Sequence, residues 1–128
     1  MQYVNPSSVP PPRGYNNGVL VGPFLFVAGQ VAYGKKGAKV EGKTIADQFR
    51  RSLENVLAVV RESGGNPQSI VKMTIYVKSV ADYKARSKEV GKAYRELMGK
   101  HFPAMTCVEV KDFYDAGALV EIDAIAVL

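Results

Sequence analysis

Residues 102–110 read Phe-Pro-Ala-Met-Thr-Cys-Val-Glu-Val, and this stretch predicts a β-strand near the end of the chain. Proline has no amide donor and fits only at the start or edge of a strand, so Pro103 marks where this strand begins. Successive side chains of a strand point to opposite faces of the sheet. The two faces therefore carry different sets of side chains: Thr106, Val108 and Val110 on one, and Met105, Cys107 and Glu109 on the other.

A second strand of the same kind is predicted in the last ten residues. Its two faces carry Val120, Ile122, Ala124 and Ala126 on one side, and Leu119, Glu121, Asp123 and Ile125 on the other. If the two strands pair, Cys107 and Glu121 lie on the same face of the sheet. A face that combines a thiol and carboxylates with apolar side chains is typical of a covered surface, and we expect a partner subunit to cover it.

The length of 128 residues suits a single domain, residues 1–128, whose core needs no disulfide or structural metal. One cysteine, Cys107, excludes an internal disulfide, and the single histidine, His101, leaves no cluster at metal-ligand spacing. No apolar run is long enough for a membrane span, and the N-terminal residues lack the basic start and apolar core of a signal peptide. We therefore expect a cytoplasmic protein without a metal.

The formal net charge of +5 raises the question of an anionic partner such as nucleic acid. The lysines and arginines are spread along the chain, with no run longer than two. Scattered charge is typical of a solvated surface. Nucleic acid is therefore not an expected partner.

Two amphipathic helices are predicted between the strands. Thr44 and Asp47 resemble a capping box, and apolar residues then recur at helical spacing as far as the glycines at 64 and 65. A second helical region is predicted over roughly residues 80–99, where apolar residues form a stripe that ends at Gly99. Both helices have one apolar face, so each is expected to pack on a sheet.

The remaining strands are predicted around these helices. A proline-rich arm at residues 5–14 precedes a hairpin at residues 19–28, a bulge or close approach at Gly29-Gln30, and a loop at residues 34–37. An alternating pattern predicts another strand over residues 71–77. The predicted order is ββαβαββ, an α+β fold in which one mixed sheet carries both helices on one face.

Six phrases, in the same order along nearly the whole chain, resemble the RidA family (reactive intermediate deaminase A, also called YjgF-like). They are Arg13-Gly14-Tyr15, Phe26-Val27-Ala28-Gly29-Gln30, Leu53-Glu54-Asn55-Val56, Ile70 through Val77, Phe102-Pro103-Ala104 through Val110, and Val120 through Val127. The resemblance implies a chorismate-mutase-like fold and a homotrimer with sites in the clefts between subunits. It also implies hydrolysis of reactive 2-imino or enamine acids to 2-oxo acids and ammonia, without a cofactor.

The resemblance assigns roles residue by residue. The family's tyrosine after the N-terminal arm matches Tyr15, its backbone-contributing cysteine matches Cys107, and its water-positioning glutamate matches Glu121. A serine that often precedes Gly-Gln in the family is Ala28 in this chain, and the arginine that binds the substrate carboxylate is Met105. In this respect the chain resembles the arginine-lacking branches of the family.

Methionine has no hydrogen-bond donor, so Met105 cannot replace the bidentate pair that an arginine makes with a carboxylate. Arg13 is a candidate for the missing cation. Free cysteines are most often small buried hydrophobic residues, so we expect Cys107 to act through its backbone rather than as a nucleophile. The roles expected are therefore catalysis for Glu121 and substrate binding for a set of five residues: Arg13, Tyr15, Ala28, Met105 and Cys107.

Three functions remain open at this point. The first is hydrolysis of reactive imines or enamines to oxo compounds and ammonia, with a substrate altered by the loss of the arginine. The small molecule expected in the intersubunit cleft is then an imine, an enamine or an oxo acid. The second is a non-catalytic trimer, either a small-molecule-binding or a chaperone-like protein, that uses an apolar site at Met105. The third is RNA cleavage or inhibition of translation, an older label for the family, and RNA affinity that falls steeply with salt would support it.

Overall fold

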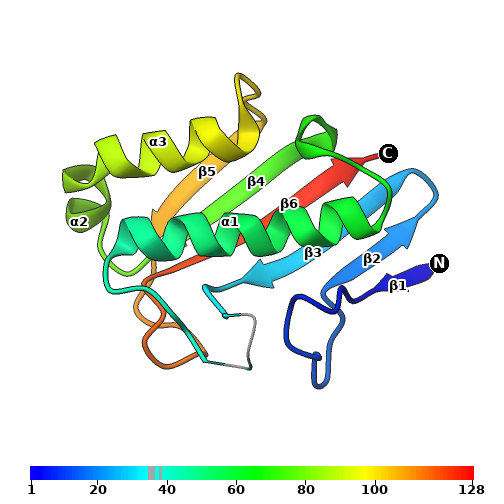
Figure 1. Cartoon of the computed structure of the whole chain (residues 1–128), viewed down its shortest axis with the longest axis horizontal. Coiled ribbons are helices and arrows are strands. Elements are labelled where there is room, and N and C mark those ends of the chain that lie inside the picture. Colours follow the sequence, from blue (N-terminus) through cyan, green and yellow to red (C-terminus); the bar gives the residue numbers. More distant parts are fainter. Residues whose placement is uncertain (35–36, 38) are drawn as a thin grey trace.

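The computed structural model describes residues 1–34, 37 and 39–128, and it contains one six-stranded sheet with the helices on one face (Figure 1). The loop predicted at residues 34–37 lies partly outside the described residues. The elements are β1 (Gln2–Val4), β2 (Gly18–Val21), β3 (Phe24–Gln30), α1 (Ile45–Glu62), β4 (Ile70–Val77), α2 (Val80–Ala85), α3 (Ser87–Met98), β5 (Ala104–Glu109) and β6 (Val120–Val127), with a 3₁₀ turn at Pro67–Ser69. The predicted α+β architecture is confirmed, with a short additional strand, β1, and a second helical region that consists of two helices.

The strands lie in the order β1-β2-β3-β6-β4-β5. Strand β5 runs parallel to β4, and every other pair of neighbours is antiparallel. A parallel pair needs a long crossover connection, and α2 and α3 supply it between β4 and β5. Strand β5 has only β4 beside it, so it forms one edge of the sheet.

Helix α1 packs along the sheet because its sequence caps one end and buries one face. The Thr44 hydroxyl accepts a hydrogen bond from the Asp47 amide at 3.1 Å, and the Asp47 carboxylate accepts one from the Thr44 amide at 3.3 Å. This reciprocal pair is the predicted capping box. The helix ends before Gly64, whose φ of 93° favours glycine. Its fully buried apolar side chains are Ile45, Phe49, Leu53, Val56, Leu57, Val59 and Val60.

The second helical region breaks at Arg86, which has non-helical φ and ψ of −104° and 19° and separates α2 from α3. Helix α3 ends at Gly99, with a φ of 66°. Two hydrogen bonds fix the chain where it returns to the sheet. The Tyr94 hydroxyl donates to the His101 carbonyl at 2.5 Å, and the His101 Nε2 lies 2.7 Å from the Ile70 carbonyl. These contacts give His101 a structural role.

The N-terminal arm is attached to the sheet by amide side chains. The Asn5 carbonyl oxygen Oδ1 accepts a hydrogen bond from the Asn17 backbone at 2.9 Å, and the buried Gln30 side chain donates to Asn17 Oδ1 at 3.1 Å. Gln30 also donates to the Ala28 carbonyl at 3.2 Å. The register between β3 and β6 shifts between Val27 and Gln30, so the predicted bulge is confirmed.

Strands β5 and β6 do not pair, because β4 lies between them. Along β4, Ile75 is the partner of both Cys107 and Ile122, while Tyr76 is the partner of Glu121. Partners in register point to the same face. Cys107 therefore lies on the helix-covered face and Glu121 on the opposite face, and the expectation that they share a face is wrong.

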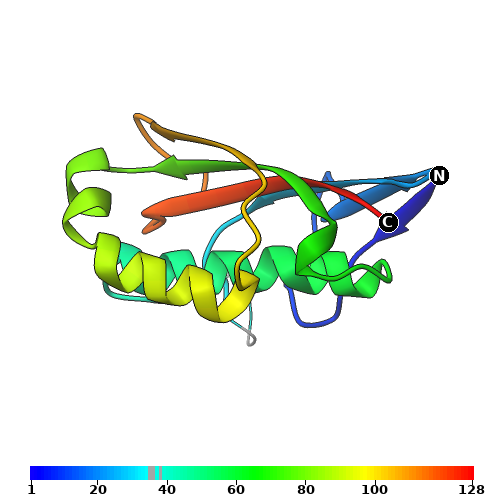
Figure 2. The ribbon, with the colours of Figure 1, turned by 90° about the horizontal axis from the view of Figure 1, so that it is seen from above.

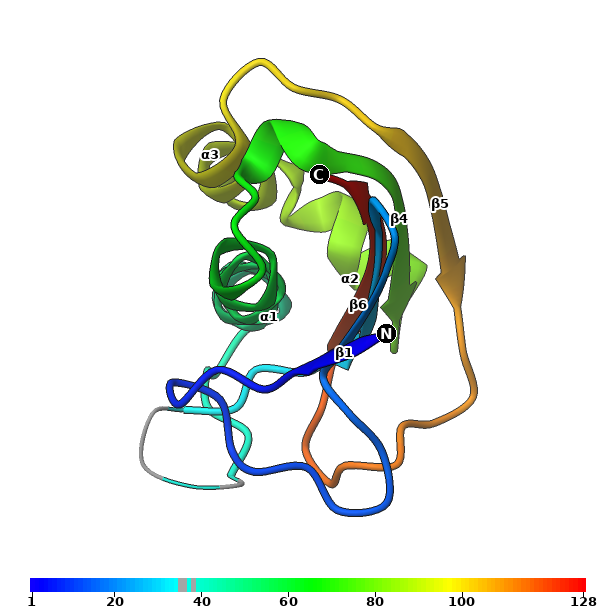
Figure 3. The ribbon, with the colours of Figure 1, turned by 90° about the vertical axis from the view of Figure 1, so that its right-hand side faces the viewer.

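The face that carries Glu121 is covered by no helix in the described part of the chain, and we call it the open face (Figures 2 and 3). Its strands nevertheless carry exposed apolar side chains besides the polar ones. The exposed apolar side chains in register on this face are Tyr3, Val21, Phe24, Phe26, Val108 and Val127. An exposed apolar sheet face of this kind is typical of an interaction surface.

Candidate functional site

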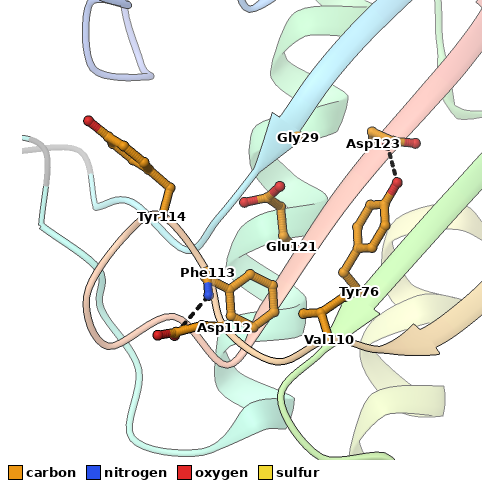
Figure 4. A pocket seen from close by; sticks show the side chains of 8 residues that line it. All are labelled: Gly29, Tyr76, Val110, Asp112, Phe113, Tyr114, Glu121 and Asp123. Atoms are coloured by element: carbon orange, nitrogen blue, oxygen red, sulfur yellow. Dashed lines mark hydrogen bonds between the residues drawn. The ribbon is translucent and has the colours of Figure 1, made fainter.

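A cavity of about 230 Å³ lies on the open face, and we call it the Glu121 cavity. Glu121 comes from β6 and Tyr76 from β4, while the loop that follows β5 provides the opposite wall. Figure 4 shows these side chains on one side of the sheet, with Phe113 and Tyr114 of the loop beside them. The lining residues are Gly29, Tyr76, Val110, Asp112, Phe113, Tyr114, Glu121 and Asp123.

Gly29 gives the Glu121 side chain its place in this cavity. A Cβ atom on residue 29 would lie 2.5 Å from Glu121 Oε2 and 2.9 Å from its carboxyl carbon, closer than side chains pack. The bulge that contains Gly29 therefore serves as a backbone wall against which the carboxylate lies. The sequence prediction of a close approach at this point is confirmed.

The electrostatic surroundings of Glu121 favour its protonated form. Desolvation by burial is the largest cause that raises the pKa of this carboxyl, and the negative charges of Asp115 and Asp123 raise it further. The residues that line the cavity include no lysine or arginine to oppose these effects. Glu121 is thus a half-buried carboxyl suited to exchanging a proton with a bound molecule.

Two tyrosines hold the neighbouring aspartates. The Tyr76 hydroxyl donates to Asp123 Oδ2 at 3.0 Å, and the Tyr33 hydroxyl donates to Asp115. The pKa values of both tyrosines are raised, first by desolvation and then by these aspartates. Both hydroxyls therefore stay protonated at neutral pH, and they fix the two negative charges near Glu121.

Tyr15 and Arg13 line a second cavity of about 530 Å³, which we call the tyrosine cavity. Its other walls include Tyr33 and Tyr114, and Tyr114 also lines the Glu121 cavity, so the two spaces adjoin. The Tyr15 ring is about half exposed, and burial followed by the charges of Asp115 and Glu121 raises the pKa of its hydroxyl. The Glu121 charge thus reaches the Tyr15 hydroxyl, and the role of Tyr15 in substrate binding stays a prediction.

Met105 lines a different space, a groove of about 420 Å³ on the helix-covered side of the sheet. We call it the Met105 groove. It lies between β5 and the helices α1, α2 and α3. Its lining residues are Phe49, Ile75, Tyr83, Lys84, Ser87, Val90, Gly91, Tyr94, Arg95, Phe102 and Met105.

The structure thus divides the predicted site residues into two groups. Arg13 and Tyr15 line the tyrosine cavity, and Ala28 lies in β3 next to Gly29, with its amide donating to the Asn17 carbonyl at 2.9 Å. Met105 and Cys107 lie on the other side of the sheet. Within one chain, Arg13 lines the tyrosine cavity and does not line the Met105 groove.

Cys107 is exposed, so the expectation of a buried cysteine is wrong for the single chain. The cause is the edge position of β5, all of whose residues are exposed. Partial burial raises the pKa of the Cys107 thiol, which keeps it protonated at neutral pH. This protonation agrees with a backbone role rather than a nucleophilic one.

Three residues near Glu121 were not singled out from the sequence: Tyr33, Tyr76 and Asp115. Tyr76 alternates with core residues along its strand, which made it resemble an ordinary solvent-facing residue. Tyr33 and Asp115 are 82 positions apart, and no periodic pattern connects them. Only the folded chain brings these groups together.

The described residues contain no group of three or more His, Cys, Asp or Glu side chains arranged to hold a metal ion. None of the helices among them is both long enough and apolar enough to span a membrane.

Comparison with known proteins gives matches over nearly the whole chain. The family model described as Endoribonuclease L-PSP matches residues 6–128. A RutC family protein of Pyrococcus horikoshii is 36% identical over 120 residues, which cover 93% of this chain and 91% of that protein. The 2-iminobutanoate/2-iminopropanoate deaminase of Escherichia coli K12 is 35% identical, and the match covers 88% of this chain and 86% of that protein.

Two solved structures have the same fold. The YjgF gene product of Escherichia coli matches with a TM-score of 0.87 and 31% identity, covering 99% of this chain and 98% of that one. Escherichia coli TdcF with bound serine matches with a TM-score of 0.88 and 28% identity, covering 100% of this chain and 99% of that one.

Proposed function

The chain belongs to the family described as Endoribonuclease L-PSP, which is also called the RidA or YjgF family, and on this premise we propose that it is an imine deaminase. Its proposed substrates are reactive imines or enamines of small acids. Its products are the corresponding oxo compounds and ammonia. A relative that is 35% identical carries the name of such a deaminase, which supports this reaction class.

The observation that carries the proposal is the half-buried Glu121 carboxyl, which lies against Gly29 in the Glu121 cavity. Its raised pKa lets it hold a proton closer to neutral pH than an exposed glutamate does. A carboxyl in such an environment can take a proton from water and return it to a leaving group.

In the proposed reaction, a water molecule held by the Glu121 carboxylate adds to the imine carbon. Glu121 takes a proton from this water and passes it to the imine nitrogen, which becomes an amine. The adduct then collapses: Glu121 takes the proton of the new hydroxyl group and passes it to the amine nitrogen, the C–O bond becomes a double bond, the C–N bond breaks, and the nitrogen leaves as ammonia. One water is consumed for each imine, so the carboxyl ends in its starting state.

A homotrimer is the second part of the proposal. Glu121 and Met105 lie on opposite faces of one sheet, so a ligand that touches both must lie between two copies of the chain. The exposed apolar side chains of the open face also favour association with further copies. We therefore propose that each site combines the Glu121 cavity of one chain with the Met105 groove of its neighbour.

The proposed activity can be tested with 2-iminopropanoate, which an amino-acid oxidase generates in situ from alanine. Decay of the imine, followed as release of ammonia, should be faster with this protein than in buffer. Glu121→Gln should remove the acceleration, whereas Glu62→Gln, at the exposed end of α1, should keep it. If neither 2-iminopropanoate nor a larger imino acid decays faster with the protein, imine hydrolysis is excluded.

The apolar lining of the Met105 groove favours a second candidate function, a trimer that binds small molecules without transforming them. Binding and turnover separate the two functions. In a non-catalytic protein, Glu121→Ala would leave ligand affinity unchanged and there would be no turnover to lose. In a deaminase, the same change removes turnover even where ligand affinity remains.

A further inference from the structure

The Met105 groove is bounded by two pairs of aromatic rings. Phe49 and Tyr83 are tilted against each other, with ring centroids 6.1 Å apart and an interplanar angle of 60°. Tyr94 and Phe102 are stacked, with centroids 5.6 Å apart and an angle of 9°. All four rings line the groove. A planar apolar group placed between the pairs would find aromatic contacts on both sides.

The surfaces between the aromatic pairs are also apolar. Ile75 and Val90 are almost fully buried where they line the groove, and Met105 faces them from β5 with 40% of its surface exposed. The methionine thioether adapts its shape and makes favourable contacts with aromatic rings. These apolar surfaces thus suit a hydrocarbon group.

Two cationic side chains line the Met105 groove beside its apolar surfaces. Arg95 and Lys84 line it, and its lining residues include no aspartate or glutamate. Arg95 forms no ion pair with any carboxylate in the described part of the chain. A guanidinium without a carboxylate partner beside an apolar groove is complementary to an acid with an apolar body.

Gly91 makes room for the Arg95 side chain. These residues are four positions apart in α3, so their side chains lie on the same face of the helix. A Cβ atom at Gly91 would lie 3.2 Å from the Arg95 guanidinium nitrogen Nη1, which is tighter than ordinary contact. The guanidinium therefore lies over the glycine and along the wall of the groove, not away from it.

We propose that the Met105 groove binds a monocarboxylate with an aromatic side chain, and that Arg95 pairs with its carboxylate. The ring lies between the two aromatic pairs, and the carboxylate meets the guanidinium at the α3 side. As a statement about substrate, this inference rests on the proposed function: the preferred substrate is then an aromatic 2-imino acid. As a statement about binding, it stands on the groove alone.

Phenylpyruvate, a stable 2-oxo acid, is a suitable probe for isothermal titration calorimetry. It should bind more tightly than pyruvate, which lacks the ring, and more tightly than 4-phenyl-2-butanone, which lacks the carboxylate. Arg95→Gln should weaken phenylpyruvate binding by about 10- to 100-fold, since a charge-assisted hydrogen bond is lost. The same variant should leave the binding of the neutral ketone unchanged.

The matched control is Lys88→Gln, which removes one positive charge from an exposed position of the same helix that does not line the groove. It should leave phenylpyruvate affinity within about twofold, because Lys88 does not line the groove and a charge without direct contact is screened by solvent. Equal weakening by both variants would reduce the effect to general charge attraction and overturn the proposal. Pyruvate binding as tight as that of phenylpyruvate would also overturn it.

Different results would overturn the ligand assignment and the proposed function. Arg95-dependent binding of phenylpyruvate without imine hydrolysis would overturn the proposed function and keep the assigned ligand class. Full hydrolysis of 2-iminopropanoate by Arg95→Gln, together with binding of phenylpyruvate that does not depend on Arg95, would overturn the assigned ligand class and keep the proposed function.

Discussion

The Glu121 cavity and the Met105 groove lie on opposite sides of one sheet, and they differ in almost every chemical respect. The Glu121 cavity is lined by three carboxylates and two tyrosines and has no cation, while the Met105 groove is lined by aromatic and aliphatic groups with two cations and no carboxylate. The cavity can hold water and exchange protons. The groove can hold an apolar acid, so each space supplies what the other lacks.

The difference shows how proton exchange and ligand binding can be divided between the two faces of a sheet. The negative charges of Asp115 and Asp123 around Glu121 disfavour a negatively charged ligand there, because like charges repel. A groove lined by Arg95 and Lys84 attracts that ligand, and the same lining includes no carboxylate that could act as a base. Joining the two regions across a subunit interface would place the reacting carbon near Glu121 and keep the carboxylate of the ligand near Arg95.

The largest expected effect comes from removing the proton-exchanging group. Glu121→Gln should lower kcat for imine hydrolysis by about 10²- to 10⁴-fold, which is the usual contribution of general acid–base catalysis. Phenylpyruvate affinity should change little, because the ligand is held in the groove. Ammonia release measures the first effect and calorimetry the second. Loss of both in parallel would break the division of roles between the two regions.

A stability measurement serves as the folding control for this variant. The pKa of Glu121 is raised in the folded chain, so the folded state binds more protons than the unfolded state as pH rises from the ordinary glutamate value. Ionisation of Glu121 therefore lowers the free energy of unfolding over this pH range and above it. Glu121→Gln should remove this decline and be at least as stable as the wild type at neutral pH.

Gly29→Ala should have the next largest effect. The new Cβ would lie 2.5 Å from Glu121 Oε2, so the carboxyl must move away from the bulge. A displacement of about 1 Å can reduce the catalytic rate about 100-fold. Because the flexible end of a side chain moves, thermal unfolding should show a loss of only about 1 kcal/mol. Unchanged turnover would show that the Glu121 position against the bulge is not required.

Asp115→Asn should shift the pH dependence of turnover. The Asp115 charge raises the pKa of Glu121. Removal of this charge should therefore move the part of the pH–rate profile that depends on Glu121 ionisation to lower pH. Asp112→Asn is the control: Asp112 lines the same cavity, but Lys78 pairs with it at 3.1 Å and it does not contribute to the raised pKa. An unchanged pH–rate profile in Asp115→Asn would contradict the role of the Asp115 charge in raising the pKa of Glu121.

Gly91→Ala should have the smallest effect and separates stability from binding in the groove. Alanine stabilises a helix interior by about 0.5–1 kcal/mol relative to glycine. Its Cβ should also displace the Arg95 guanidinium by a few tenths of an ångström, because the two lie 3.2 Å apart. Thermal unfolding should show the gain, and calorimetry should show a few-fold weaker binding of phenylpyruvate. Tighter binding would place Arg95 outside the ligand contact.

Most of the secondary structure and the family were predictable from the sequence, but the short strand β1 and the break between α2 and α3 were not. Helix α1 followed from its apolar periodicity and the Thr44–Asp47 capping box, and the bulge at Gly29 followed from a glycine inside a strand pattern. Both are local features, in which nearby residues determine the backbone. The resemblance to the RidA family, based on six ordered phrases, is also confirmed.

The arrangement of the site was not predictable in the same way. Alternation shows which side chains share a face of one strand, but it does not identify the neighbouring strand or its register. Strand β4 lies between β5 and β6, which places Cys107 and Glu121 on opposite faces. Arg95 was one of many charged helix residues, and its relation to the groove depends on the fold.

The central claim is that a complete site needs two chains, and active-site complementation tests it most directly. One chain carries Glu121→Gln and the other carries Met105→Glu, which places a carboxylate in the groove. Each variant alone should form inactive trimers. If every site joins the cavity of one chain to the groove of its neighbour, each mixed trimer regains one intact site of three.

Refolding the two variants together in equal amounts, with mixed trimers verified by native mass spectrometry, should therefore restore about a quarter of the wild-type turnover. About three quarters of randomly assembled trimers are mixed, and each mixed trimer has one intact site of three, so about one quarter of all sites are intact. Mixed trimers that remain as inactive as the two parents would contradict the account, because each site would then lie within a single chain.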